Sequence, residues 1–230
     1  MANRARTKPG EERIKVKQTN ALENLEVIYE KNKKPINTIV TIVLIAVVVV
    51  FGYFRLYLAP RDEKAGTAIS FAQRYFQADS LDKALNGDGQ HLGFLRVEKK
   101  YSGTKIANLC RYYSGICYLH LQDFNNAIKQ LKDFDGKGTL LAYAAWGAMG
   151  DAYMEMGQTK KGIEFYSKAA ANKDDMILTP TYLYREGIAY EKDNQPEEAK
   201  KAYMRLRDEY PQSMEARDID RTLARLGVLD

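Results

Sequence analysis

The stretch that decides the fold is residues 146–169, which read WGAMGDAYMEMGQTKKGIEFYSKA. Gly150 is followed by Tyr153 three positions on and by a second small residue, Gly162, twelve positions on. A small residue lets the first helix of a pair approach the second closely, and the tyrosine fills the groove beside it. Gly157 suits the left-handed residue that ends the first helix. The stretch therefore predicts a pair of packed helices.

The same spacing recurs on both sides of this stretch. Gly115 and Gly187 are each followed by a tyrosine three residues later and an alanine twelve residues later. The three glycines lie 35 and 37 residues apart. A period of this length predicts an array of helix pairs. Residues 62–100 are expected to form a fourth, degenerate pair, interrupted by a glycine-rich turn at residues 86–89. A closing helix, which covers the exposed face of a last repeat, is predicted from Met214, Ile219, Leu223 and Leu226.

This register resembles that of the tetratricopeptide repeat family. The matching residues are Trp146, Gly150, Tyr153, Tyr166 and Ala169 in the second copy and Leu183, Gly187, Tyr190, Ala199, Tyr203 and Pro211 in the third. The first copy is weaker, with Arg111 in place of the aromatic residue. The resemblance implies an all-α fold in which residues 59–230 form an α-solenoid of three to four helix pairs with a C-terminal capping helix.

A second feature is an apolar segment near the N-terminus. Residues 36–54 are nineteen consecutive residues without a charge. As a helix they would extend about 28 Å, close to the hydrocarbon thickness of a bilayer. We therefore predict a single transmembrane helix over residues 36–58, with an aromatic belt at its end formed by Tyr53, Phe54 and Tyr57.

The basic residues beside this span orient it. Lys31, Lys33 and Lys34 lie just before the span, and the positive-inside rule then makes residues 1–35 a cytoplasmic tail. The tail is expected to hold a short amphipathic helix that ends before Pro35. Two interpretations of this helix stay open: it lies on the inner membrane surface, or it docks on a membrane partner through Leu22, Leu25 and Tyr29.

The charge distribution argues against a nucleic-acid partner. The chain has 35 Lys and Arg against 30 Asp and Glu. Residues 1–35 hold nine basic and five acidic side chains, and residues 59–230 hold 25 of each. The excess positive charge therefore belongs to the tail and not to the repeats, which have no electrostatic reason to bind phosphate.

The sequence offers no catalytic or metal-binding motif. His91 and His120 are the two histidines, and they are too far apart in sequence for a metal-binding pair. Cys110 and Cys117 lie seven residues apart in a predicted helix, which separates their Cα atoms by roughly 10 Å, beyond disulfide reach. They are expected to be buried apolar residues. We therefore predict a protein that is not an enzyme and uses no cofactor or metal.

The family resemblance also assigns a partner-binding groove on the first helices of the pairs. The apolar residues assigned to it are Leu109, Tyr112, Ile116, Leu119, Met154, Tyr184 and Ile188. The same register also places Gly147, Asp151 and Glu191 along the groove. Aromatic and aliphatic side chains at these positions suit apolar stretches of a partner. The alternative is that these residues pack against the neighbouring repeat.

Over its whole length the chain resembles the YfgM-type ancillary subunits of the bacterial SecYEG translocon. The resemblance is carried by the segment Leu22–Tyr29, the span, and the passage from Leu95 through Thr104 into the first repeat, with Ser102 where that family more often has proline. It implies a single-pass inner-membrane protein whose repeats lie in the periplasm, beside the translocon and a membrane-anchored prolyl-isomerase-like chaperone. The alternative is a structural adaptor of cell-wall or outer-membrane biogenesis.

Overall fold

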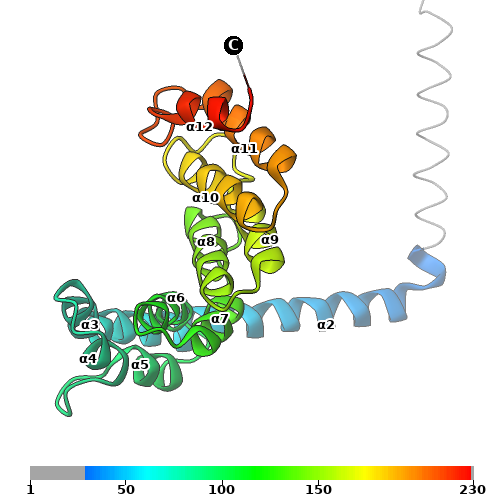
Figure 1. Ribbon diagram of the computed structural model, residues 1–230. Coiled ribbons are helices and arrows are strands. Elements are labelled where there is room, and N and C mark those ends of the chain that lie inside the picture. The colour runs from blue at the N-terminus through cyan, green and yellow to red at the C-terminus, as the bar shows by residue number, and fades with distance from the viewer. Residues whose placement is uncertain (1–28, 229–230) are drawn as a thin grey trace, which may run out of the picture. The chain divides into compact units, whose positions relative to one another are not determined.

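The computed structural model describes residues 29–228, and its regular structure is helical (Figure 1). Within this part, extended residues pair at one isolated bridge, between Gly87 and Leu92. The predicted all-α class is therefore confirmed. The chain divides into two compact units, Met1–Tyr57 and Leu58–Asp230. The docking residues predicted in the tail, Leu22 and Leu25, lie outside the described residues.

The first unit holds helix α2 (Lys33–Gly52), which leads into a π-helical segment, η1 (Tyr53–Leu58). No residue of α2 is buried. Among the described residues, one helix is long and apolar enough to cross a membrane, and its apolar window lies in the helical residues Lys33–Gln77. A membrane anchor and a signal sequence both have this character.

The helical backbone described at residues 29–31 breaks at Asn32, before Pro35, as expected, and Pro35 itself lies in the first turn of α2. The backbone N–H groups of a first turn have no partner within the helix, so a proline there costs little. Tyr29, just before the break, donates a hydrogen bond from its hydroxyl to the side chain of Asn37 (3.1 Å).

The second unit is built from ten helices within the described residues. They are α3 (Ala59–Gln77), α4 (Leu81–Asn86), α5 (Phe94–Lys100), α6 (Lys105–His120), α7 (Phe124–Asp133), α8 (Leu140–Glu155), α9 (Thr159–Ala169), α10 (Leu178–Lys192), α11 (Pro196–Glu209) and α12 (Ile219–Arg225). The pairs α6–α7, α8–α9 and α10–α11 are the three predicted repeats, each packed on the next, and α12 packs on α11 (Figure 1).

Glycine allows the helices within each pair to approach closely. A Cβ atom added to Gly150 would lie 2.6 Å from the ring of Tyr166, and one added to Gly115 would lie 2.5 Å from Leu131. Both distances are far below a van der Waals contact, so any larger residue would push the helices of a pair apart. The predicted close approach of the second helix at the repeat glycine is therefore confirmed.

The helix pairs also share one turn. After the first helix, Gln122, Gly157 and Asn194 each adopt a positive φ, of 62°, 71° and 57°. The next residue then donates its backbone N–H to the carbonyl of the tyrosine that follows the repeat glycine, at 2.9 Å in all three pairs. This geometry satisfies carbonyl groups that the end of a helix leaves free.

The degenerate pair has the same turn. Asp79 has φ 54°, and the N–H of Ser80 bonds to the carbonyl of Tyr75 at 2.9 Å. Ala72 and Ala84 are fully buried, three residues before and nine residues after that tyrosine, which repeats the spacing of the other copies. Residues 62–100 therefore carry the repeat register, with alanine in place of glycine.

The second helix of this first pair is divided in two. A loop separates α4 from α5, and the carboxylate of Asp88 organises it by accepting bonds from the hydroxyl of Tyr75 (2.6 Å) and the backbone N–H groups of Gln90 (2.9 Å) and His91 (2.6 Å). Hydrogen bonds from His91 and Tyr75 hold the pKa of Asp88 far below its usual range. The predicted glycine-rich turn is thus a folded loop.

The cysteines behave as predicted. Cys110 and Cys117 are free and fully buried on α6. Burial raises the pKa of both thiols to about 12, so they are protonated and weakly nucleophilic at neutral pH.

The shared turn makes a testable prediction about stability. Gln122→Gly is expected to raise the free energy of unfolding by about 1 kcal/mol, because glycine adopts a positive φ without the steric penalty of a Cβ atom. Gly157→Ala is the matched control, because Gly157 has the same turn and open space around it. This substitution should lower the free energy of unfolding by about 1 kcal/mol, since alanine is strained at a positive φ. Urea denaturation measures both. A loss of stability in Gln122→Gly would contradict this account.

Candidate partner-binding surface

The groove residues predicted in the first copy lie in the packing between helix pairs. Leu109, Tyr112, Ile116 and Leu119 are all half-buried on α6. The last three pack against a buried cluster formed by Leu131, Ala145, Ala148 and Met149, which joins α7 to α8. Leu109 packs instead against the cluster formed by α3, α4 and α5. These four residues therefore present little free apolar surface.

The second copy presents no open groove at its predicted positions either. The side chain of Met154 lies against Gly162, inside the α8–α9 pair: a Cβ atom added to that glycine would be 2.5 Å from the sulfur. Gly147, at another groove position, is buried beneath the ring of Tyr182 from α10. A residue of the next pair thus fills the space that the second copy would offer.

The third copy is different. Tyr184 and Ile188 on α10 are 37% and 43% exposed, although both are large and apolar. They are four residues apart and so lie on the same face of the helix. The ring of Tyr184 leans on Tyr203 of α11, with 6.0 Å between ring centroids. Of the seven predicted groove residues, these two have exposed apolar surface, and we call them the α10 face.

A polar cluster borders this face on the side of α8. The carboxylate of Asp151 accepts a hydrogen bond from the hydroxyl of Tyr166 on α9 (2.7 Å). It also forms an ion pair with Arg185 on α10 (2.6 Å). Burial, together with the charge of Asp151, raises the pKa of Tyr166, so its hydroxyl stays a donor. One carboxylate thereby links three helices of two successive pairs.

The same arrangement occurs one pair further along. The carboxylate of Glu191 accepts a hydrogen bond from the hydroxyl of Tyr203 on α11 (2.8 Å). It also forms an ion pair with Arg225 on α12 (2.8 Å). The hydrogen bond from Arg225 lowers the pKa of Glu191. In both clusters the arginine follows the acid by 34 residues. We call these two clusters the repeat clamps.

Sequence reasoning did not find the repeat clamps. Asp151 and Glu191 occupy predicted groove positions, where an acidic side chain suggests a contact with a partner. In the structure their oxygens bond to other helices of the same chain. An acid followed 34 residues later by an arginine, twice in successive repeats, is the signal that could have revealed them. The clamps link the α10–α11 pair to α8–α9 on one side and to α12 on the other.

The described residues include no metal-binding group. Between residues 29 and 228, no three His, Cys, Asp or Glu side chains lie close enough together to hold a metal ion.

Comparison with known families identifies the repeats. Two family models, both described as tetratricopeptide repeat, match residues 143–175 and 181–213. These matches fall on α8–α9 and α10–α11. The chain therefore contains tetratricopeptide repeats. No curated protein matches its sequence.

Solved tetratricopeptide-like structures are similar to it in fold. The nearly identical TPR-like repeats assigned to a kinesin light chain of Podosopora anserina have a TM-score of 0.55 and 14% identity, covering 72% of this chain and 85% of that one. A double mutant of MamA RS-1 has a TM-score of 0.51 and 19% identity, covering 74% and 84%. At such identities the likeness shows the fold alone.

The tetratricopeptide fold is a scaffold that displays helix faces to other proteins, and it is typically non-catalytic.

Proposed function

We propose that this tetratricopeptide repeat protein is a membrane-anchored scaffold that binds partner proteins through the α10 face. The observation that carries the proposal is the exposure of Tyr184 and Ile188, since large apolar side chains exposed together on one helix face can anchor a partner. The repeat clamps support it, because a preorganised surface loses less entropy when a partner binds.

In this proposal α2 is a single-pass anchor in a bacterial inner membrane. Lys31, Lys33 and Lys34 adjoin its N-terminal end, which favours a cytoplasmic tail and a periplasmic repeat domain. Anchoring would raise the effective concentration of the repeats for any partner held in the same membrane.

The partners we propose are the SecYEG translocon and a membrane-anchored prolyl-isomerase-like chaperone, with proteins emerging from the channel as clients. The support is the resemblance of the tail, the span and the approach to the first repeat to the YfgM-type ancillary subunits. An adaptor for cell-wall or outer-membrane assembly is the competing function.

Site-specific crosslinking distinguishes the two functions. A photo-crosslinking amino acid placed at Tyr184 or Ile188, in intact cells, should capture translocon subunits or the chaperone. The same amino acid at Lys201, on the exposed side of α11, is the matched control and should capture them much less. Capture of cell-wall or outer-membrane assembly factors alone would contradict the translocon assignment and favour the adaptor.

The α10 face itself is tested by charge. The double substitution Tyr184→Lys and Ile188→Lys should reduce partner capture about tenfold or more, because two charges would be buried in an apolar contact. It should change the melting temperature little, since both residues are exposed. Tyr182→Lys is the control, because Tyr182 is buried and this substitution should unfold the domain. A large thermal loss in the double variant would make Tyr184 and Ile188 core residues instead.

A further inference from the structure

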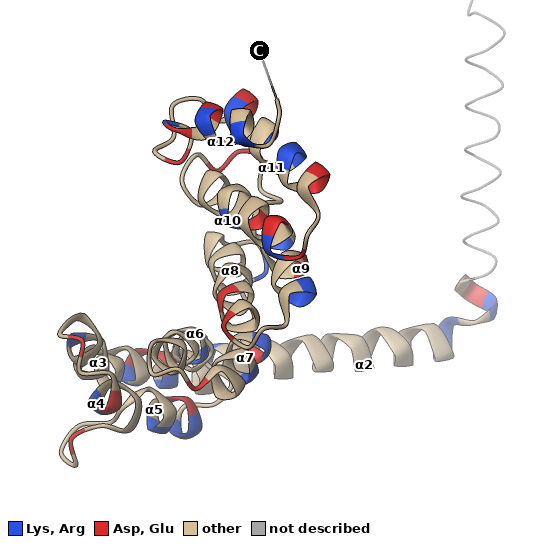
Figure 2. Cartoon of the chain, viewed as in Figure 1, with Lys and Arg blue, Asp and Glu red and all other residues tan. Residues whose placement is uncertain are grey.

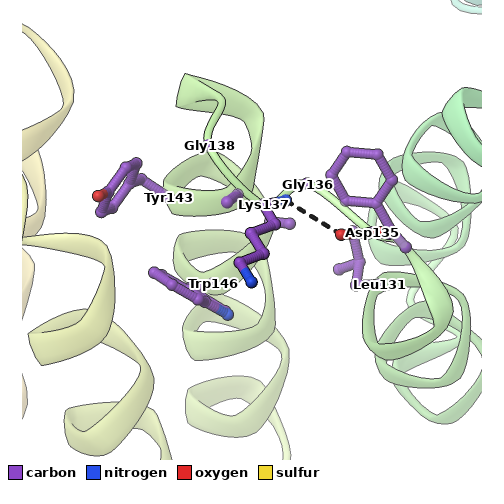
Figure 3. Close-up of a pocket in the computed structure, with 10 residues that line it drawn as sticks. Leu131, Asp135, Gly136, Lys137, Gly138, Tyr143 and Trp146 are labelled. Carbon is purple, nitrogen blue, oxygen red and sulfur yellow. Dashed lines mark hydrogen bonds between the residues drawn. The ribbon is translucent and has the colours of Figure 1, made fainter. Parts of the chain in front are cut away.

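A cavity of about 390 Å³ opens between α7 and α8, well away in sequence from the α10 face (Figure 3). Its walls are mainly apolar and include Leu131, Ala142 and Ala145 together with three aromatic residues, Phe134, Tyr143 and Trp146. The loop that joins the two helices completes it. Figure 3 shows the side chain of Lys137, from this loop, running between Trp146 and Leu131.

The loop is fixed before any ligand arrives. The side-chain amide of Asn108 on α6 bonds to both backbone groups of Asp135, donating to its carbonyl (2.8 Å) and accepting from its N–H (2.9 Å). The carboxylate of Asp135 accepts the backbone N–H of Lys137 (3.2 Å), and Gly136 is buried against Phe134. The cavity is therefore preformed, which favours binding.

A second, more polar cavity of about 430 Å³ adjoins the first at Asp135. The two adjoining cavities are lined by more positive than negative side chains: Lys105, Arg111 and Lys137 against Asp135. Within residues 29–228, neither Lys105 nor Lys137 forms a salt bridge, whereas Arg111 pairs with Glu98.

The charge count supports the same conclusion. Residues 94–138 hold eight Lys and Arg against four Asp and Glu, whereas residues 139–230 hold thirteen against sixteen. The balanced body predicted from the sequence thus has a positive part, and Figure 2 shows its basic positions on α5 and α7. A negatively charged ligand is favoured at this part of the solenoid.

We propose that this cavity binds one large apolar side chain, such as Phe, from an acidic segment of a partner protein. The side chain would lie among Phe134, Tyr143 and Trp146, where aromatic contacts add to its burial, and flanking carboxylates would pair with Lys137 and Lys105. This inference rests on the proposed function, because the ligand belongs to a partner protein, but it uses a different surface.

The test uses the full chain in nanodiscs of zwitterionic lipid. The probe is a fluorescent peptide with one Phe flanked on each side by three Glu, and anisotropy measures its binding. Lys137→Glu should weaken binding about tenfold by reversing the charge at the cavity mouth. Ala142→Leu should weaken it comparably by filling the cavity. Replacing the Phe of the probe by Ser should have a similar effect, and replacing its Glu residues by Lys should abolish binding.

The double variant of Tyr184 and Ile188 separates this inference from the proposed function. It should bind the probe as tightly as the unaltered chain while losing partner capture. If the unaltered chain does not bind the probe, or if Lys137→Glu binds it equally well, the inference is overturned and crosslinking at the α10 face still tests the proposed function. Equal binding of the Ser probe would also overturn it, because the apolar cavity would then be unused.

Discussion

Gly187→Ala is expected to lower the free energy of unfolding of the repeat domain by about 3 kcal/mol through overpacking. In the interior of a helix, alanine is normally better than glycine by about 1 kcal/mol, so the predicted sign is opposite to the intrinsic propensity. The reason is Tyr203, whose ring lies against Gly187 where a Cβ atom would have to be. The ring is 1% exposed and its hydroxyl is held by Glu191, so it has little room to move.

Gly66→Ala is the matched control. Gly66 also lies inside a helix, α3, but nothing is within 4 Å of its added Cβ atom. This substitution should raise the free energy of unfolding by up to about 1 kcal/mol. Urea denaturation of both variants gives the comparison. Adding Tyr203→Leu to Gly187→Ala should recover part of the loss. A gain of stability in Gly187→Ala itself would mean that close approach is not why this position is small.

The sequence predicted this close approach well, because the contacts within a pair are local and recur at a fixed spacing. Gly147 shows where that reasoning ends. Its neighbour is Tyr182 of the following pair, 35 residues on, and no other copy carries a glycine at the same position. A contact that occurs once, between pairs, leaves no repeated pattern in the sequence.

Register predicted which residues of different copies share a position, but not which of them are exposed. Tyr112 and Ile116 occupy the same register positions as Tyr184 and Ile188, yet the first two pack in the cluster that joins α7 to α8, and the last two are exposed. A full helix pair follows the first copy, whereas the single short helix α12 follows the third. The exposure of a groove residue therefore depends on which helices pack beside its repeat. The position of the residue within the repeat does not determine this.

Phe94→Ala is expected to have the largest effect in the N-terminal part of the solenoid, about 3–5 kcal/mol. The side chain of Phe94 is fully buried on α5. Its ring stacks on Tyr113 of α6, with 5.1 Å between centroids, and meets Phe76 of α3 edge-on at 6.4 Å. One ring thus joins three helices. Sequence analysis did not single out Phe94, because α5 is too short for a clear apolar pattern.

Two measurements check this prediction, and Leu95→Ala is the control. Leu95 lies on the same helix and is only half-buried, so its loss should cost roughly 1 kcal/mol. Thermal unfolding gives the global effect. Reaction with a thiol reagent at pH 8 gives the local one, since Cys110 and Cys117 belong to the same buried cluster as Phe94. Both thiols should be protected in the unaltered chain, with pKa values of about 12, and reactive in Phe94→Ala. If stability and protection were unchanged, α3, α4 and α5 would be an appendage. The solenoid would then begin at α6, where the glycine spacing begins.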